Sequence, residues 1–377
     1  MTSLARPRSR GLRGNEGPFG WLFTLPAILI LGTFLVIPLA VWVSFSNWNG
    51  LGPPVGGQAE FVGAANYAEV LTQPGLARRD FGIAIRNNLY YVLFVVPIQT
   101  AVALFLAVQV NQKVLKARGF FRTAFYFPSV TSSVAITVVF LYLFGASGVV
   151  NGVLNWLRVR GPNWFADPRG VFHIVLSWLG VDSVPSFLAG EGPLGVTWWE
   201  WIAGPSVAMT ALIALAVFTT SGTFMLLFLA GLQAIGQDIE EAALVDGAGP
   251  VRKFFSITLP MLKPTLFTVL TLGLIATWQV FDQIYLTGGG APAKTTLTPA
   301  FLAYSASFES LKWGRGAAIS FILFGIIVVL TIFQRWLLRD REGSRRNRRR
   351  RARMAQAGAM AAITTGGGHG TGGGAGE

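Results

Sequence analysis

The chain contains 377 residues, of which 52% are hydrophobic and only 12% are charged, and its formal net charge is +13. Soluble domains average about 25% charged residues, so this composition excludes an ordinary soluble fold and predicts a membrane protein. The absence of cysteine excludes disulfides and cysteine-ligated metal sites, and the presence of only two histidines argues against a histidine metal cluster or catalytic triad. We therefore expect no catalytic residues and no metal site in this chain.

The positive charge lies mainly in the two ends of the chain. Residues 1–16 contain four arginines and one glutamate, and residues 335–377 contain ten arginines and three acidic residues. Nucleic-acid binding needs a basic face on a folded domain, so this distribution argues against a nucleic-acid partner. We assign residues 1–18 to a basic cytoplasmic tail. Residues 341–377 are assigned to a disordered tail, first arginine-rich and then glycine-rich, that attracts anionic lipid.

Six windows are long and apolar enough to cross about 30 Å of hydrocarbon, which takes about 20 helical residues. They are residues 21–44, 89–110, 124–144, 207–230, 265–286 and 316–337. Lipid offers no hydrogen-bond partners to the backbone, so we predict an all-α polytopic membrane protein with six transmembrane helices within residues 19–340. A signal peptide is the alternative for the first window, but its length and the lack of a cleavage site after Ser44 favour a retained helix.

The distribution of lysine and arginine favours a cytoplasmic N-terminus. The inside segments then hold 21 of the 30 basic residues, and both termini lie in the cytoplasm. The connections after spans 1 and 3 are then extracytoplasmic, and we expect residues 78–80 to form a solvated loop in the first of them. In the second, the apolar run 171–181 is too short to cross and predicts an interfacial or re-entrant helix, in which His173 has a structural role.

The segment between spans 4 and 5, residues 235–264, is too polar to cross the membrane but is patterned like two short helices. Acidic residues lie in an early turn, where the helix dipole favours anions. Gly247 suits a left-handed turn, Pro250 suits the first turn of a second helix, and Pro260 and Pro264 are expected to end that helix before span 5. We predict a cytoplasmic helix–turn–helix that docks in a groove of a soluble partner, with an ordinary connecting loop as the alternative.

The residues of this segment resemble the EAA signature of permease subunits of bacterial ABC importers. Gly236, where many relatives carry proline, departs from that pattern, but the spacing otherwise matches without gaps. The signature also includes Phe254 and Pro264. The resemblance implies coupling to a separate ATPase through Glu241, Ala242, Ala243, Asp246, Gly247, Ala248, Ile257, Leu259 and Pro260.

Further stretches resemble sugar permeases of the maltose and glycerol-3-phosphate type and extend the likeness over about residues 20–340. Residues 61–67 resemble the FVGxxNY element, which points to the first of the two permease subunits in such systems. Residues 287–318 resemble the stretch between spans 5 and 6, with the expected proline displaced to Pro292. Residues 161–198 look like an extracytoplasmic insertion relative to this family, and the C-terminal tail is unmatched.

The resemblance implies the MetI-like permease fold and a heteromeric importer in the bacterial cytoplasmic (inner) membrane. Its partners would be a second permease subunit, a dimer of ATP-binding cassette ATPases, an extracytoplasmic solute-binding protein and the lipid bilayer. The chain has no G-x-x-x-x-G-K-[ST] motif. We therefore expect no cofactor in this chain and ATP in the partner ATPase, whose closure would move spans 4 and 5 through residues 235–264.

Polar residues inside the spans are candidates for the solute path, because intramembrane polar groups tend to face a cavity or a partner helix. The residues assigned to this path are Thr220 and Thr223 in span 4 and Gln279 and Asp282 in span 5, with Asn88 and Tyr90 in span 2 as weaker candidates. Hydrogen-bonding groups beside aromatic faces suit a sugar, and related maltose-type permeases use these two helices. The alternatives are bonds from threonine to its own helix, and a gate or helix-interface role for Asp282.

These observations favour a permease subunit that forms half of the translocation pathway of an ATP-driven sugar importer. The nearest alternative is the same architecture importing glycerol-3-phosphate, a polyol or another small solute. A membrane enzyme using Asp282 and Glu241 is a second alternative, which their expected positions toward opposite faces argue against. A membrane-tethered RNA or lipid adaptor, acting through the arginine-rich tail, is a third.

Overall fold

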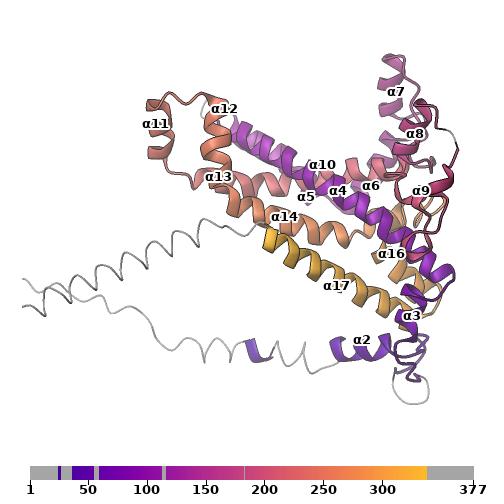
Figure 1. The fold of residues 1–377 in the computed structure, drawn as a ribbon. Coiled ribbons are helices and arrows are strands. Elements are labelled where there is room, and N and C mark those ends of the chain that lie inside the picture. Colours follow the sequence, from indigo (N-terminus) through magenta and orange to yellow (C-terminus); the bar gives the residue numbers. More distant parts are fainter. Residues whose placement is uncertain (1–23, 27–35, 55–58, 113–115, 182, 338–377) are drawn as a thin grey trace, which may run out of the picture. The chain divides into compact units, whose positions relative to one another are not determined.

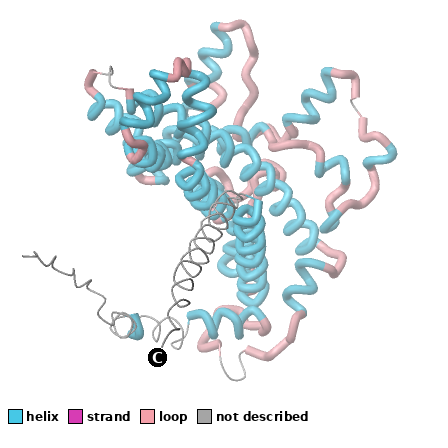
Figure 2. The backbone as a smooth tube through the Cα atoms, turned by 60° about the vertical axis from the view of Figure 1, so that its left-hand side comes forward, coloured by secondary structure: helices cyan, strands magenta, loops and turns pink. Residues whose placement is uncertain are grey.

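The computed structural model describes residues 24–26, 36–54, 59–112, 116–181 and 183–337 of the chain. These residues form helices joined by loops, and no β-strand occurs among them (Figures 1 and 2). Among them, four helices are long and apolar enough to cross a membrane, or five spans if one bent helix pair is counted as a crossing. Much of the predicted first span, residues 21–44, lies outside the described residues, which include its end as helix α2 (Val36–Ser44). The all-α membrane fold is confirmed, and the count of six spans stays a prediction.

The four long apolar segments agree with predicted spans 2, 4, 5 and 6. They are α4 (Leu76–Asn111), α10 (Val207–Gln233), Lys263–Leu286, which comprises α14 (Lys263–Trp278) and α15 (Asp282–Leu286), and α17 (Trp313–Leu337). The 36 residues of α4 give it a length of about 54 Å at 1.5 Å per residue, longer than the predicted span. Residues 78–80 were expected in a loop, but they lie within the first turns of α4.

Predicted span 3 is broken in the structure. Helix α5 (Arg118–Val130) and helix α6 (Ser133–Leu143) are bent by 96° relative to each other. Pro128 lies in the last turn of α5, and Thr131 beyond it has extended backbone angles (φ −72°, ψ 147°). Proline removes one helical N–H donor and crowds the preceding turn, so the expectation of one helix over residues 124–144 was wrong.

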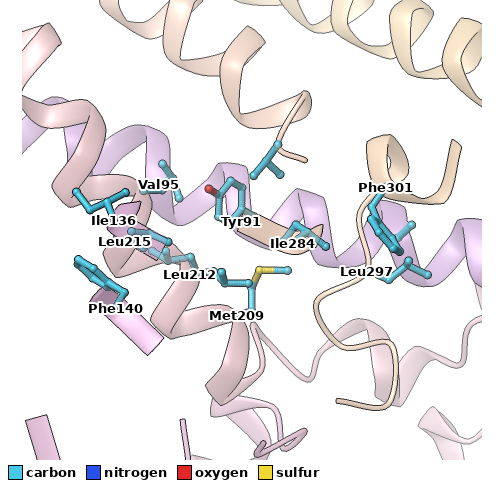
Figure 3. Close-up of a cluster of buried hydrophobic side chains, with 14 residues drawn as sticks. Tyr91, Val95, Ile136, Phe140, Met209, Leu212, Leu215, Ile284, Leu297 and Phe301 are labelled. Atoms are coloured by element: carbon cyan, nitrogen blue, oxygen red, sulfur yellow. The ribbon is translucent and has the colours of Figure 1, made fainter. Parts of the chain in front are cut away.

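The core is built where α10 packs along α4. One apolar cluster joins these two helices to α6, α15 and helix α16 (Pro299–Tyr304), as Figure 3 shows for Tyr91, Leu212 and Ile284. A second cluster lies between the other ends of α4 and α10 and includes Val269 of α14. Close packing of large apolar side chains along two helices holds α4, α10 and α14 together as one scaffold.

Short helices lie in the connections after predicted spans 1 and 3. They are α3 (Ala65–Leu71), α7 (Val149–Trp156), α8 (Val171–Trp178), η2 (Ser186–Leu188), η3 (Pro193–Gly195) and α9 (Trp198–Trp201). Helix α8 confirms a short helix in the apolar run 171–181. A π-helical turn, η5 (Ser305–Glu309), follows α16.

Three ion pairs join the start of α4 to distant segments. Arg78 pairs with Glu191 at 3.2 Å and Arg79 pairs with Glu200 at 3.5 Å, while Asp80 accepts from Lys294 at 2.7 Å. The residues expected in a solvated loop are therefore contact points for residues 161–198, for α9 and for the segment before α16. Each of these partly exposed pairs contributes at most about 1 kcal/mol, so they orient these segments more than they stabilise the fold.

The described residues up to Val328 form one compact unit, and the described residues from Val329 to Leu337 belong to a second. Within the described part of the second unit, the rings of Phe333 and Trp336 stack with centroids 6.2 Å apart.

Candidate functional site

The segment between α10 and α14 forms the predicted helix–turn–helix. Helix α11 (Gln237–Val245) is followed by Gly247, whose φ of +67° is left-handed, and helix α12 (Pro250–Lys253) begins at the expected proline. The N–H of Ala248 donates to the carbonyl oxygen of Ala243 at 3.0 Å, closing the end of α11 around the glycine. A residue with a Cβ atom is disfavoured in this conformation, which explains the glycine at this turn.

The second helix of this segment ends between the two prolines that were expected to end it. After α12 the chain forms a π-helical turn, η4 (Phe254–Thr258), and then α13 (Leu259–Met261), where Pro260 lies in the first turn. The helix breaks at Leu262 (φ −80°, ψ −2°), and Pro264 lies in the first turn of α14. The second helix therefore ends between Pro260 and Pro264 and before span 5, as expected, with Pro260 inside its last turn, where the irregular turn before it accommodates the missing N–H.

The tip of the helix–turn–helix exposes apolar side chains. Val245 is 88% exposed, Val251 69% and Phe255 62%. Glu241, Ala242 and Asp246 are also exposed, whereas Ala243 is only 3% exposed. Ala243 therefore supports the turn from within. The exposed valines and phenylalanine are additional residues that the comparison with the EAA signature did not single out.

A polar cavity of about 240 Å³ lies where α4, α10 and the end of α14 meet. Three of the four predicted path residues, Thr220, Gln279 and Asp282, line it. The other lining residues are Tyr91, Val95, Gln99, Ala216, Thr219, Phe224, Ala276, Thr277, Val280, Phe281 and Gln283. The structure thus brings predicted residues from two helices to one cavity and adds a third wall from α4.

The cavity lies against a break in predicted span 5. Helix α14 ends at Trp278, and Phe281 (φ −136°, ψ −57°) precedes the first residue of α15. Thr298 donates its hydroxyl hydrogen to the carbonyl oxygen of Val280 at 3.2 Å, which satisfies one backbone group freed by the break. Non-helical backbone at membrane depth is tolerated where it lines a cavity, and Gln279, Val280 and Phe281 line this one.

Thr223, the fourth predicted path residue, does not line this cavity. Its backbone N–H donates to the hydroxyl of Ser129 at 3.2 Å, and that hydroxyl donates to the carbonyl oxygen of Thr219 at 2.6 Å. Thr223 therefore lies on the side of α10 that contacts α5. Its assignment to the solute path stays a prediction without support from this cavity.

Gln99 and Tyr91 were absent from the predicted site, although both line the cavity from α4. The sequence signal for Gln99 was present, since a glutamine in an apolar run of span 2 must face a partner or a cavity. The hydroxyl of Thr220 lies 2.6 Å from Oε1 of Gln99, which joins α10 to α4 at the cavity wall.

The connection after predicted span 3 contains charged and aromatic contacts. His173 stacks on Trp199 with ring centroids 4.1 Å apart, and its Nε2 lies 3.1 Å from the carbonyl oxygen of Trp199. Burial lowers the pKa of His173, although this hydrogen bond acts in the opposite direction. Burial also opposes ionisation of Glu200, but hydrogen bonds from Thr197 and nearby arginines hold its pKa below the usual value.

The geometry argues against the alternative of a membrane enzyme. Glu241 lies in α11 and Asp282 begins α15, so the full 16 residues of α14 separate them, about 24 Å of helix. Within the described part of the chain, no group of three or more His, Asp or Glu residues is arranged to hold a metal ion.

Comparison with known families identifies one match over most of the membrane region. Residues 99–342 match the family described as binding-protein-dependent transport system inner membrane component. The matched region contains the helix–turn–helix and all the cavity residues except Tyr91 and Val95.

Several characterised relatives match over most of their length. The lactose transport system permease protein LacF of Rhizobium radiobacter is 30% identical over 329 residues, covering 86% of this chain and 95% of that protein. The trehalose/maltose transport system permease protein MalF of Thermococcus litoralis is 30% identical over 323 residues, covering 85% and 94%. The arabinooligosaccharides transport system permease protein AraP of Bacillus subtilis is 29% identical over 316 residues, covering 83% and 86%.

A solved structure shares the fold. A chain of a bacterial ABC transporter involved in the import of the acidic polysaccharide alginate superposes with a TM-score of 0.61, at 19% identity, covering 86% of this chain and 96% of that one. The same transporter has been solved in complex with an alginate pentasaccharide-bound periplasmic protein. At this identity the likeness establishes the fold alone.

Proposed function

The chain belongs to the family of binding-protein-dependent transport system inner membrane components, and from that premise we propose that it is the permease subunit of an ATP-driven sugar importer. It forms half of the translocation pathway and takes its energy from a separate ATPase. The observation that carries this proposal is the helix–turn–helix between α10 and α14, with its left-handed Gly247 and its exposed apolar tip.

The exposed tip supports docking to a soluble partner. Three large apolar side chains in water are unfavourable, and their burial in a groove would gain about 1.5–3 kcal/mol for each fully covered side chain. Ala242 leaves room for close approach, and Glu241 adds a charge beside it. The tip is joined directly to α10 and α14, both of which line the cavity. Movement of a docked ATPase would therefore act on two cavity walls at once.

The chemistry of the cavity supports a neutral hydroxylated solute. Threonine, glutamine and tyrosine side chains offer hydrogen bonds, and Phe224 and Phe281 offer aromatic surfaces. The lining residues include Asp282 but no lysine, arginine or histidine, so a phosphate ester would find no cationic partner there. We therefore favour sugars over glycerol-3-phosphate, in keeping with the lactose, trehalose/maltose and arabinooligosaccharide systems of the named relatives.

The size of the cavity supports a pathway shared with a second permease. A small-molecule site encloses about 300–1,000 Å³, and the cavity in this chain is smaller, at about 240 Å³. Gln279 and Asp282 are also exposed in the isolated chain. A second permease subunit would cover these residues and complete the site.

We assign both termini and the helix–turn–helix to the cytoplasm of a bacterial cell and residues 161–198 to the outer side. The arginine-rich ends favour this orientation under the positive-inside rule. An extracytoplasmic solute-binding protein then delivers the sugar to the outer end of the pathway, and the ATPase dimer docks at the opposite end.

The test is uptake by the reconstituted importer. The chain is purified with its second permease and ATPase, placed in liposomes, and supplied with the solute-binding protein and radiolabelled lactose, maltose, arabinobiose or glycerol-3-phosphate. ATP-dependent uptake of at least one sugar supports the proposal. Uptake that continues without the ATPase, or glycerol-3-phosphate uptake without sugar uptake, contradicts it.

A further inference from the structure

The side chain of Gln99 is buried in α4, and only one of the two polar atoms of its amide makes a hydrogen bond. Its exposed fraction is 0%. Oε1 lies 2.6 Å from the hydroxyl of Thr220, whereas Nε2 has no hydrogen-bond partner among the described residues. A buried polar group left unpaired costs about 1–3 kcal/mol, so the unpaired amide atom destabilises the folded protein at this packed position.

The unpaired half of the amide lies against α14. Gln99 lines the cavity together with Val95 and Tyr91, which lie four and eight residues earlier on the same face of α4. Opposite the amide stands Gly273 of α14, where a Cβ atom would lie 2.5 Å from Nε2. Any larger residue at position 273 would therefore displace the amide from its place.

Either orientation of the amide leaves one polar atom for a ligand. If Oε1 accepts from Thr220, an N–H donor remains at the cavity. If the amide is turned over, Nε2 donates to the Thr220 hydroxyl, which then donates to the carbonyl oxygen of Ala216 at 2.7 Å, and a carbonyl acceptor remains. A hydroxyl group is both donor and acceptor, so it can satisfy either arrangement.

We propose that Gln99 is a sugar-binding residue of the translocation pathway, with its free amide atom hydrogen-bonded to a solute hydroxyl and Thr220 holding the amide in place. This proposal rests on the proposed function and adds a binding wall from span 2. It explains why an unpaired amide is kept beside a glycine at the centre of the scaffold.

Two variants test the proposal from opposite directions. Gln99→Met keeps the length of the side chain and removes its hydrogen bonds. Gly273→Ala keeps the amide but fills its space. Both are expected to lower sugar uptake per assembled complex at least tenfold, because a lost hydrogen bond of about 1.4 kcal/mol is a factor of ten. ATP hydrolysis stimulated by the binding protein is expected to continue.

Thr100 supplies the matched control. It is the next residue on the same helix, its exposed fraction is 7%, its hydroxyl donates to the carbonyl oxygen of Val96 in its own helix at 2.7 Å, and it does not line this cavity. Thr100→Val is therefore expected to leave uptake per assembled complex within twofold of the wild type.

The experiment uses the intact importer in liposomes with radiolabelled lactose, maltose and arabinobiose, together with thermal unfolding to count folded complexes. Selective loss of uptake in Gln99→Met and Gly273→Ala supports the proposal. Uptake in Gln99→Met within twofold of the wild type overturns it while the proposed function stands. Equal losses in Thr100→Val also overturn it, because the effect would then be structural. If the wild type carries none of the three sugars, the proposed function fails first and the role of Gln99 with it.

Discussion

Asn66 of α3 donates a hydrogen bond through Nδ2 to the carbonyl oxygen of Ser46 at 2.8 Å. The same amide group donates to the carbonyl oxygen of Ser44 at 3.0 Å, and the hydroxyl of Tyr67 donates to the Ser44 hydroxyl at 2.8 Å. The side chains of both serines are buried. The Asn-Tyr pair of the FVGxxNY element therefore links α3 to the last residue of α2 and to Ser46 just after it. These bonds are a structural reason for the element.

Replacing Asn66 by leucine should destabilise this junction. Two buried carbonyl oxygens lose their donor, and each unpaired group costs about 1–3 kcal/mol. We expect a lower midpoint of thermal unfolding for the purified protein in detergent. Thr72→Ala is the control, because this exposed hydroxyl bonds only to the carbonyl of Ala68 in its own helix. Equal midpoints for Asn66→Leu and the wild type would show that the junction has no energetic importance.

Gly247 and Gly249 offer a matched test of the helix–turn–helix. Gly247 has a φ of +67°, whereas Gly249 has a φ of −62° and no heavy atom within 4 Å of a built Cβ. Alanine at 247 should cost about 1 kcal/mol in the left-handed conformation and loosen the turn. Uptake coupled to ATP hydrolysis should fall in Gly247→Ala and persist in Gly249→Ala, with equal membrane insertion of both. A larger loss in Gly249→Ala would argue against the turn geometry.

A polar tip should weaken ATPase binding. Val245→Ser removes an apolar side chain whose full burial is worth about 1.5–3 kcal/mol, and 1.4 kcal/mol corresponds to a tenfold change in affinity. We expect the Kd of the ATPase for the permease in detergent to rise about tenfold or more. Val153→Ser on α7, where the valine is also exposed, should leave this Kd unchanged. The docking role fails if both variants bind the ATPase as the wild type does.

The stacked His173 should make stability depend on pH. Burial lowers its pKa in the folded protein from the ordinary value of 6.5, so folding favours the neutral ring. This contribution is complete above about pH 6.5 and is lost as the pH falls below that value. Thermal unfolding from pH 8 to pH 5 should show a steeper loss of stability in the wild type than in His173→Gln. Parallel curves would exclude this role for His173.

The sequence was sufficient to predict the long helices and the helix–turn–helix. Apolar runs of membrane length mark α4, α10 and α17 directly, and a glycine followed by a proline marks the turn between α11 and α12. These are local signals that depend on composition and backbone preference. Family resemblance added the coupling role, which periodicity alone left undecided.

The interruptions of the helices could not be predicted from apolar composition. The bend after Val130 and the break at Phe281 occur within runs that are hydrophobic enough to cross a membrane. Where backbone bonds can be interrupted depends on tertiary partners, such as the hydroxyl of Thr298 at Val280. The residues that line the cavity likewise depend on tertiary packing. Polarity marked Thr220 and Thr223 equally, but only the packing of α10 shows which of them faces the cavity.

The central claim is that the tip of the helix–turn–helix docks on a separate ATPase and transmits its movement to the pathway. Because the chain contains no cysteine, a single cysteine can be placed at the tip by Val245→Cys and, as a control, on α7 by Val153→Cys. In membranes that contain the intact importer, a short thiol–amine crosslinker should join Val245→Cys to the ATPase subunit and leave Val153→Cys unjoined. Absence of this crosslink in a complex that still transports sugar would contradict the account.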